Sequence, residues 1–333
     1  MAANASLPAR DLLAQPLNAA DFARAAQEIY TELLPTPQLA WPLLAQRCGC
    51  EVWVKHENHL PTGAFKVRGG LWFMQQLSEA QPAVRGVVAA TRGNHGQSIG
   101  YAARLHELSA LIVVPRGNNA DKNRAMKALG VELIEHGDDF NAALDYATLL
   151  AAERGLYQVP SFHPLLVQRV GTCGYELFRA IPELDAVYVP IGLGSGIAGM
   201  LAARNALGLR TEIIGVVSAH ADAYAQSFER GELVSTAHAD TLADGLAVRV
   251  PSAEALRYLR TGVARVVRVS DDEVLQAIAA LFADTHNTVE GAGAAPLAAL
   301  MKERERMAGR RVALVVSGGN IDRATMARAL NCV

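Results

Sequence analysis

The sequence has little of what marks secreted, membrane-spanning or nucleic-acid-binding proteins. It contains only 4 cysteines in 333 residues, and lysine and arginine are not in excess, with a formal net charge of −2. No apolar stretch reaches the roughly 18 residues that a membrane-spanning helix needs. Without a basic surplus, nothing favours nucleic acid or an anionic membrane surface as a partner. We therefore expect neither nucleic acid nor membrane among its partners.

The cysteines and the first residues indicate the compartment. Cys48 and Cys50 lack a second metal-type pair, and Cys173 and Cys332 stand alone. Few, scattered thiols are typical of a reducing compartment. Residues 1–15 show no basic segment followed by the apolar run of a secretory signal. We expect a soluble, cytoplasmic protein.

The composition and the apolar pattern favour a large α/β fold. Hydrophobic residues make up 51% and charged residues 19%, so a sizeable core can form, and the length exceeds that of one ordinary core. Short apolar runs alternate with helical segments, which predicts parallel sheets covered by helices and two lobes. The expected strands are residues 52–54, 87–90, 111–114, 131–134, 186–189, 213–217 and 312–316. The expected helices are residues 18–34, 70–77, 98–105, 120–129 and 140–154.

The first candidate motif is PTGAFKVRG at residues 61–69, between an expected strand and helix. Phe65 supplies apolar surroundings for Lys66, and Arg68 adds a nearby cation. Desolvation and a like charge both lower the pKa of an amine and make it a nucleophile. The alternative is an ordinary solvated surface lysine. The context favours Lys66 as a Schiff-base lysine.

The second motif, TRGNHGQ at residues 91–97, follows an expected strand and opens a helix. Backbone N–H groups at a helix N-terminus bind anions. The alternative is a glycine-rich turn with an asparagine cap.

The third motif, GLGSG at residues 192–196, again joins a strand to a helix. Glycines let backbone amides approach a phosphate, and the helix dipole adds to the attraction. A dinucleotide would suit such a loop as well, and Glu212 lies near the spacing of the acidic residue that such a site requires. A nucleotide-binding module therefore stays open at this point.

Two further segments complete the set. Residues 316–320, VSGGN, end the last expected strand, and residues 290–294 read EGAGA. In isolation, the first predicts a strand followed by a turn, and Glu290 is also a candidate helix cap.

These motifs, in this order, resemble those of the fold-type II enzymes that use pyridoxal 5′-phosphate (PLP), in particular the serine/threonine dehydratases and their close kin serine racemase. The resemblance covers roughly residues 35–322. It implies a two-lobed, tryptophan synthase β-like fold with PLP as cofactor, and a homodimer. A large PLP-binding domain would comprise residues 1–80 and 163–333, with a small domain at residues 81–162.

The resemblance also implies roles. Lys66 would bind PLP as a Schiff base and, once freed, remove the α-proton of the substrate. Asn94 would bond the phenolic oxygen of PLP, Ser317 its pyridine nitrogen, and Glu290 would lie beside the ring. His95 would shape its loop rather than transfer protons. The expected cofactor-binding residues are Phe65, Lys66, Asn94, Gly192, Leu193, Gly194, Ser195, Gly196, Glu290, Ser317 and Gly318. The expected substrate-binding residues are Thr91, Arg92, Gly93, Asn94 and His95, around the α-carboxylate.

Two departures from the family pattern stand out. Arg92 occupies the position of the serine acid/base of serine racemase, so racemisation through that residue is not expected. Arg92 either turns to solvent or an acidic partner, or points over the β-carbon of the substrate, where it would suit a carboxylate or an aromatic ring. Val217 and Ala223 occupy the positions of the racemase's acidic cation ligands, with only Asp222 nearby, so we expect no metal there.

The implied function is that of a dehydratase, or ammonia-lyase, which converts a β-hydroxy-α-amino acid to a 2-oxo acid and ammonia. Threonine or serine is the default substrate. Specificity for 3-hydroxyaspartate or phenylserine is an alternative because of Arg92, and a β-replacement synthase is another.

Overall fold

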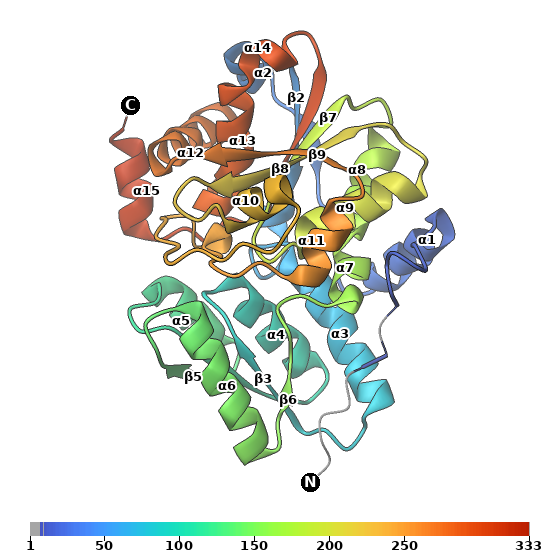
Figure 1. Ribbon diagram of the computed structural model, residues 1–333, viewed down its shortest axis with the longest axis vertical. Coiled ribbons are helices and arrows are strands. Elements are labelled where there is room, and N and C mark those ends of the chain that lie inside the picture. Colours follow the sequence, from blue (N-terminus) through green and yellow to red (C-terminus); the bar gives the residue numbers. More distant parts are fainter. Residues whose placement is uncertain (1–6, 9, 333) are drawn as a thin grey trace.

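The structure is a computed structural model that describes residues 7–8 and 10–332, and it is built around two β-sheets (Figure 1). Among these residues the larger sheet has six strands in the order β1-β2-β10-β7-β8-β9, and the smaller has four in the order β5-β4-β3-β6. The strands are β1 (Gln38–Ala40), β2 (Glu51–His56), β3 (Gly86–Ala90), β4 (Ser109–Val114), β5 (Glu132–Glu135), β6 (Tyr157–Gln158), β7 (Ala186–Pro190), β8 (Glu212–Ser218), β9 (Val263–Val269) and β10 (Arg311–Val316).

The named strands pair in parallel, except for the antiparallel pair of β1 and β2. Strands from the two ends of the chain are neighbours, because β2 pairs with β10 from Glu51↔Arg311 to His56↔Val316. Parallel strands point their carboxyl ends to one edge of a sheet, and ligands of α/β proteins bind beyond that edge. The expected α/β class with parallel sheets is confirmed.

Helices cover both sheets. They are α1 (Ala19–Ile29), α2 (Pro42–Cys48), α3 (Lys66–Ala80), α4 (Asn94–Leu105), α5 (Ala120–Ala128), α6 (Phe140–Arg154), α7 (Pro164–Val170), α8 (Thr172–Ala180), α9 (Ser195–Ala206), α10 (Ala223–Arg230), α11 (Ala253–Leu259), α12 (Asp271–Thr285), α13 (Gly291–Lys302), α14 (Arg304–Met307) and α15 (Arg323–Leu330). Two short 3-10 turns, η1 (Glu57–His59) and η2 (Asp244–Leu246), lie in loops. None of the helices in the described part of the chain is long and apolar enough to cross a membrane.

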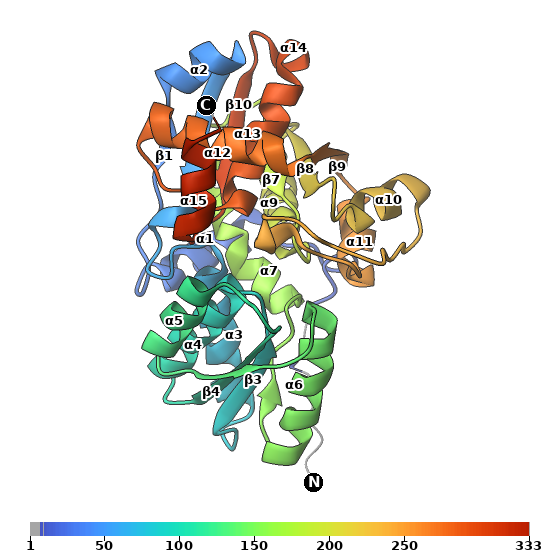
Figure 2. The same ribbon diagram turned by 90° about the vertical axis from the view of Figure 1, so that its left-hand side faces the viewer.

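Both faces of the smaller sheet are buried, as an apolar strand without strict alternation predicts. In β3, Val87 and Ala89 pack with residues of α3 and α4, whereas Val88 and Ala90 pack against α6. Figure 2 shows α3, α4 and α5 on one side of this sheet and α6 on the other. The sheet is therefore the middle layer of three.

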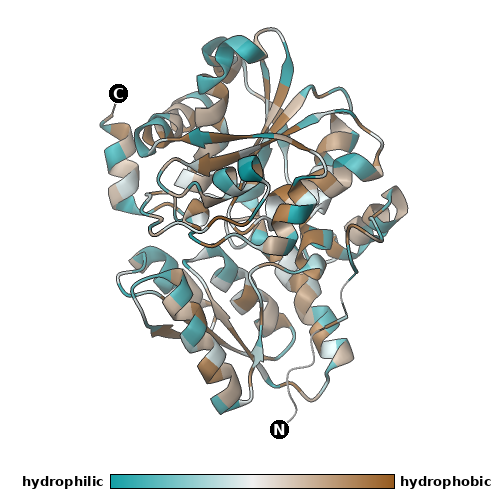
Figure 3. Cartoon of the chain, viewed as in Figure 1, coloured by the Kyte–Doolittle hydropathy of each residue, from teal (hydrophilic) through white to brown (hydrophobic). Residues whose placement is uncertain are grey.

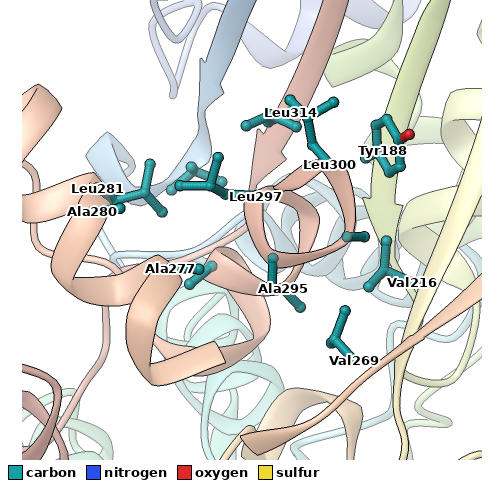
Figure 4. Packing of buried hydrophobic residues seen from close by; sticks show 14 of the residues in the cluster. Tyr188, Val216, Val269, Ala277, Ala280, Leu281, Ala295, Leu297, Leu300 and Leu314 are labelled. Atoms are coloured by element: carbon teal, nitrogen blue, oxygen red, sulfur yellow. The ribbon is translucent and has the colours of Figure 1, made fainter. Parts of the chain in front are cut away.

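The core of the larger sheet forms around α13, whose sequence GAGAAPLAALMK is apolar on nearly every side. Leu297 and Leu300 of this helix pack with Tyr188 of β7, Val216 of β8 and Leu314 of β10 (Figure 4). A helix that is hydrophobic all round is a buried helix. Figure 3 shows the same segregation, with hydrophobic colouring along the inner strands and hydrophilic colouring on outer helices such as α14.

Several elements differ from the predicted ones. Helix α3 begins at Lys66, not at residue 70, and α1 ends at Ile29, although residues 18–34 were expected to be helical. Strand β9 was not predicted because its sequence, VARVVRV, carries two arginines. It lies at the edge of the sheet, where charged side chains reach solvent and prevent further pairing.

The expected domain boundaries at residues 80 and 162 stay a prediction. The strands of the smaller sheet lie between Gly86 and Gln158, and α3 adds Phe73, Met74 and Leu77 to the core that β3 and β4 share. The expectation about a secretory signal concerns residues 1–15, of which 1–6 and 9 lie outside the described residues.

A buried ion cluster holds α3 against the larger sheet. Arg68 is fully buried and its Nε lies 2.7 Å from Oε2 of Glu57, while its Nη1 lies 2.7 Å from Oε1 of Glu176. Lys55 of β2 adds a second cation at 2.5 Å from Oε2 of Glu176. Two cations thus face two carboxylates in the interior. Removal of one partner leaves an uncompensated buried charge, which is far more costly than the loss of an exposed pair.

We predict that Arg68→Leu lowers the free energy of unfolding by about 3–5 kcal/mol, because Glu57 and Glu176 lose their main partner. Urea unfolding at pH 7, followed by circular dichroism, measures the change. Arg116→Leu is the matched control, since it removes an exposed pair with Asp138 and should cost at most about 1 kcal/mol. Equal losses in the two variants would contradict a structural role for the cluster.

Candidate active site

A cavity of about 670 Å³ collects the predicted motifs. Its wall includes residues just past the carboxyl ends of three strands, namely Thr91 after β3, Gly192 after β7 and Ser317 after β10. These are the carboxyl ends of parallel strands from both sheets, so the fold brings together segments that are far apart in the sequence. The volume is ordinary for a site that binds a small ligand.

Lys66 lies in this wall as the first residue of α3. The backbone before it pairs with the segment after β10, because Phe65 N donates to Ser317 O at 3.0 Å and Ala64 forms an antiparallel bridge with Gly318. Ser98 of α4 donates its hydroxyl to the carbonyl of Lys66 at 2.7 Å. The position of Lys66 relative to Ser317 is thus set by the backbone.

Burial lowers the pKa of Lys66 to about 8, against an opposing effect of the negative charge of Glu290. The Nζ of Lys66 lies 4.9 Å from the centroid of the Phe65 ring. The expectation that Arg68 contributes as a nearby cation was wrong. Arg68 faces Glu57 and Glu176 instead, since residues two apart on a helix do not face each other.

The loop from Thr91 to Gly93 joins β3 to α4 and begins with a local hydrogen bond from Gly93 N to Thr91 Oγ1 at 2.9 Å. A Cβ at Gly93 would lie 2.4 Å from Cδ of Lys122, so a larger residue would displace the Lys122 side chain. Asn94 starts α4, and the first N–H groups of a helix have no partner within it. The loop thus presents backbone donors toward an anion.

His95 lines the cavity in a buried position, and its Nε2 has no hydrogen-bond partner among the described residues. Burial, with a smaller effect of the positive charge of Lys66, lowers the pKa of His95 to about 3. The ring is therefore neutral near pH 7, which suits a residue that shapes the loop better than one that accepts protons.

The glycine loop after β7 has no room for a side chain at Gly192 or Gly194. A Cβ at Gly192 would lie 2.5 Å from the carbonyl oxygen of Gly245, and one at Gly194 would lie 2.8 Å from Cβ of Ala255. Gly194 has φ +101° and precedes Ser195, the first residue of α9. Exposed amides at the start of a twelve-residue helix form a cradle that fits a phosphate group.

The dinucleotide alternative does not fit this arrangement. Glu212, its candidate acidic residue, begins β8, whereas the glycine loop follows the carboxyl end of the parallel strand β7. Glu212 instead pairs with Arg265 at 2.8 Å. Glu212 and the glycine loop therefore lie at opposite ends of the neighbouring strands.

Glu290 is buried and precedes α13, yet its side chain does not cap that helix. Its Oε1 accepts a hydrogen bond from Nδ2 of Asn94 at 2.5 Å, and its Oε2 lies 3.1 Å from Nζ of Lys122. Asn320 in turn donates to Oδ1 of Asn94 at 2.9 Å. Of the two alternatives for Glu290, the structure therefore excludes the cap and places the carboxylate in the cavity wall.

Lys122 and Asp244 are among the charged residues of the wall that were missed in the sequence. Lys122 of α5 is buried, and Asp244 lies in η2. The Nζ of Lys122 lies 3.4 Å from Oδ2 of Asp244 as well as near Glu290. Burial alone would lower the pKa of Lys122, but the two carboxylates outweigh it and raise that pKa. No local pattern marks either residue, because their partners come from distant parts of the chain.

Of the two positions expected for Arg92, the structure shows the first, in which the side chain pairs with an acidic residue. The Nη2 of Arg92 lies 3.6 Å from Oδ1 of Asp244, and its side chain is 34% exposed at the rim of the cavity.

At the racemase-type cation position, Val217 and Ala223 are buried apolar residues, and Asp222 is bonded to Arg268 at 2.9 Å. Across the described part of the chain, no three His, Cys, Asp or Glu side chains gather in a way that could hold a metal ion.

Comparison with known proteins identifies the family. The model of the family "Pyridoxal-phosphate dependent enzyme" matches residues 29–318. An L-threonine ammonia-lyase of Geobacter sulfurreducens is 36% identical over 284 residues, which cover 85% of this chain and 70% of that protein. The catabolic L-threonine dehydratase of Escherichia coli K12 is 31% identical over 310 residues, or 92% and 94% of the two chains.

Solved structures show the same likeness. The processed form of threonine deaminase isoform 2 from Solanum lycopersicum superimposes with a TM-score of 0.85 at 27% identity, over 96% of this chain and 90% of that one. Maize serine racemase gives a TM-score of 0.87 at 26% identity, over 95% and 98%. The expected cofactor, PLP, is confirmed. The backbone amides of the glycine loop and the amine of Lys66 fit its phosphate and its aldehyde. The chain belongs to the family of pyridoxal-phosphate-dependent enzymes, within the fold-type II group of serine/threonine dehydratases.

Proposed function

We propose that the protein is a dehydratase, or ammonia-lyase, that converts a β-hydroxy-α-amino acid of the threonine or serine type to a 2-oxo acid and ammonia. The observation that carries this proposal is the pairing of a cavity lysine, Lys66, with a neutral serine, Ser317, through adjacent backbone. The relatives named as threonine ammonia-lyases and dehydratases support it.

In this proposal each part of the wall has one task. Lys66 would bind PLP, the amides of residues 192–196 would hold its phosphate, and Asn94 and Ser317 would contact the ring. When bound, the cofactor supplies an electron sink for the bond between the α-carbon and its hydrogen. The amides at the start of α4 would hold the α-carboxylate of the substrate.

The chemistry that follows needs a base and a leaving group. The neutral amine of Lys66 would take the α-proton, and the β-hydroxyl would take up one proton and leave as water, so that the α-proton and a hydroxide are lost in sum. The released enamine takes up water again and loses ammonia, so the net products are a 2-oxo acid and ammonia. Because Ser317 carries no charge, it would not keep the ring nitrogen protonated, which shortens the life of a carbanion and favours elimination.

We predict that the purified holoenzyme forms 2-oxo acid and ammonia from L-threonine or L-serine without an added thiol, and that Lys66→Ala lowers kcat by at least about 10³-fold. The variant should also lose the visible absorption of lysine-bound PLP while its urea midpoint is kept. Lys127→Ala, at an exposed position of α5, is the control. If product appears only when sulfide or a thiol is added, the enzyme is a β-replacement synthase instead.

A second prediction concerns the titration of Lys66 in the apoenzyme. Burial disfavours the charged amine, so a pKa lowered from 10.5 to about 8 means that Lys66 becomes neutral as the pH rises through 8. Labelling by a small acylating reagent, read by mass spectrometry of the Lys66 peptide, should therefore rise through a midpoint near pH 8 and level off at higher pH. Glu290→Gln should move the midpoint lower, because the charge of Glu290 favours the protonated amine. A midpoint near 10.5 would show that burial does not act on this amine.

We further propose a cytoplasmic homodimer, on the family resemblance and on the state of the thiols. Cys48, Cys50 and Cys173 are buried and unpaired, and burial raises the pKa of Cys48 to about 12. Such thiols are inert and suit a reducing compartment. Light scattering of the purified holoenzyme should give twice the chain mass of 35.5 kDa, and a single-chain mass would refute the dimer.

A further inference from the structure

One part of the cavity is not used by the motifs predicted from the sequence. Its wall is formed by Phe140 and Leu144 of α6, Phe162 of the loop before α7, and Val248 of the loop after η2. Each of these side chains is only partly buried. They are therefore apolar surfaces that remain available to a ligand in the same cavity as Lys66.

An ion pair holds the two walls of this apolar compartment together. Arg249, the residue after Val248, places Nη2 at 2.9 Å from Oδ2 of Asp139, the residue before Phe140. Asp139 is itself fixed as the cap of α6, because its side chain accepts a hydrogen bond from Ala142 N at 2.8 Å. Val248 and Phe140, which both line the cavity, are thus each next in sequence to a member of this ion pair.

The cations near this compartment are already engaged with carboxylates. Besides Lys66, they are Arg92, which faces Asp244, and Lys122, which lies 3.1 Å from Glu290. Arg249 forms the pair just described. A second carboxylate on a substrate would have to displace one of these partners and would meet the negative charges of Asp244 and Glu290. Arg92 keeps a buried Nε without a hydrogen-bond partner among the described residues, but each of these cations already faces a carboxylate, and those carboxylates repel an acidic side chain.

Threonine offers only a methyl group to such a wall. Each methylene that enters a hydrophobic pocket is worth about 10- to 200-fold in discrimination between substrates. Two phenylalanines, a leucine and a valine present more apolar surface than one methyl group can cover. A ring or a branched alkyl group would use it, since aromatic pairs also gain from offset or edge-to-face contact.

We infer that the β-carbon of the preferred substrate carries an apolar group larger than methyl, an aryl or branched alkyl group as in phenylserine. The inference rests on the proposed function, because it concerns the side chain of the same β-hydroxy amino acid. The compartment of Phe140, Leu144, Phe162 and Val248 receives that group. Arg92 and Lys122 keep their carboxylate partners and take no part in binding it.

Binding to the holoenzyme tests the inference without turnover. L-Phenylalanine, L-alanine and L-aspartate have no β-hydroxyl to lose, and their Kd values follow from the change in the absorption of the bound cofactor. We expect L-phenylalanine to bind at least about tenfold more tightly than the other two. Phe140→Ser should reduce this advantage over L-alanine to within about threefold. Val248→Ser, in a loop, should act in the same direction and serves if Phe140→Ser does not fold.

Leu149→Ser is the matched control, because Leu149 lies on the exposed side of the same helix, with 51% of its surface accessible. It should change none of the three Kd values. Loss of the phenylalanine advantage in this control as well, or tighter binding of L-aspartate than of L-phenylalanine, overturns the inference.

Turnover then separates the inference from the proposed function. The ratio of kcat/KM for phenylserine to that for threonine, measured by oxo-acid formation, should be at least about 10 and should fall in Phe140→Ser. If phenylalanine binds as expected but no oxo acid forms from any hydroxy amino acid, the proposed function is wrong and the apolar compartment stands. If threonine reacts but phenylalanine binds no better than alanine, the function stands and the inference falls.

Discussion

The backbone contact between residues 63–65 and 317–319 is the constraint on which the rest of the site depends. Phe65 N bonds to Ser317 O at 3.0 Å, and Gly319 N bonds to Gly63 O at 2.9 Å. The contact exists because β2 and β10 are parallel neighbours whose carboxyl ends emerge together. Lys66, the first residue of α3, is thereby held beside Ser317 by main-chain geometry, which a change of side chain alone does not alter.

The charged side chains in the cavity wall form pairs of opposite sign. Arg92 and Lys122 lie opposite Asp244 and Glu290. Burial lowers the pKa of Lys66, and the negative charge of Glu290 only partly opposes this effect. The site therefore contains one amine that loses its proton easily among charges that stay fixed. A base that works near neutral pH needs such a difference between neighbouring groups.

The sequence predicted the features that depend on short segments, and missed those that depend on tertiary neighbours. The glycine loops after apolar runs and the strands that were expected are local patterns, and they lie close to their expected positions. The partners of Lys122 and Arg68 come from distant segments, so no spacing could indicate them. The mistaken role of Arg68 shows the limit well, because a residue two positions away is close in sequence but lies on another side of the helix. Strand β9 escaped prediction since the arginines of an edge strand resemble those of a loop.

The same ion pairs connect the two halves of the cavity, and they affect which substrate side chains the cavity can bind. Arg92 and Lys122 follow strands of the smaller sheet, while Asp244 and Glu290 belong to the part of the chain around the larger one. Their contacts, together with that of Arg249 with Asp139, therefore bridge the two sheets across the cavity. Under the inferred preference, an acidic side chain would compete with Asp244 and Glu290 for these cations and would weaken the contact between the halves. An apolar side chain leaves them in place and removes water from around them, which strengthens each pair. Under the inferred apolar preference, one set of ion pairs would both disfavour an acidic side chain and connect the two sheets.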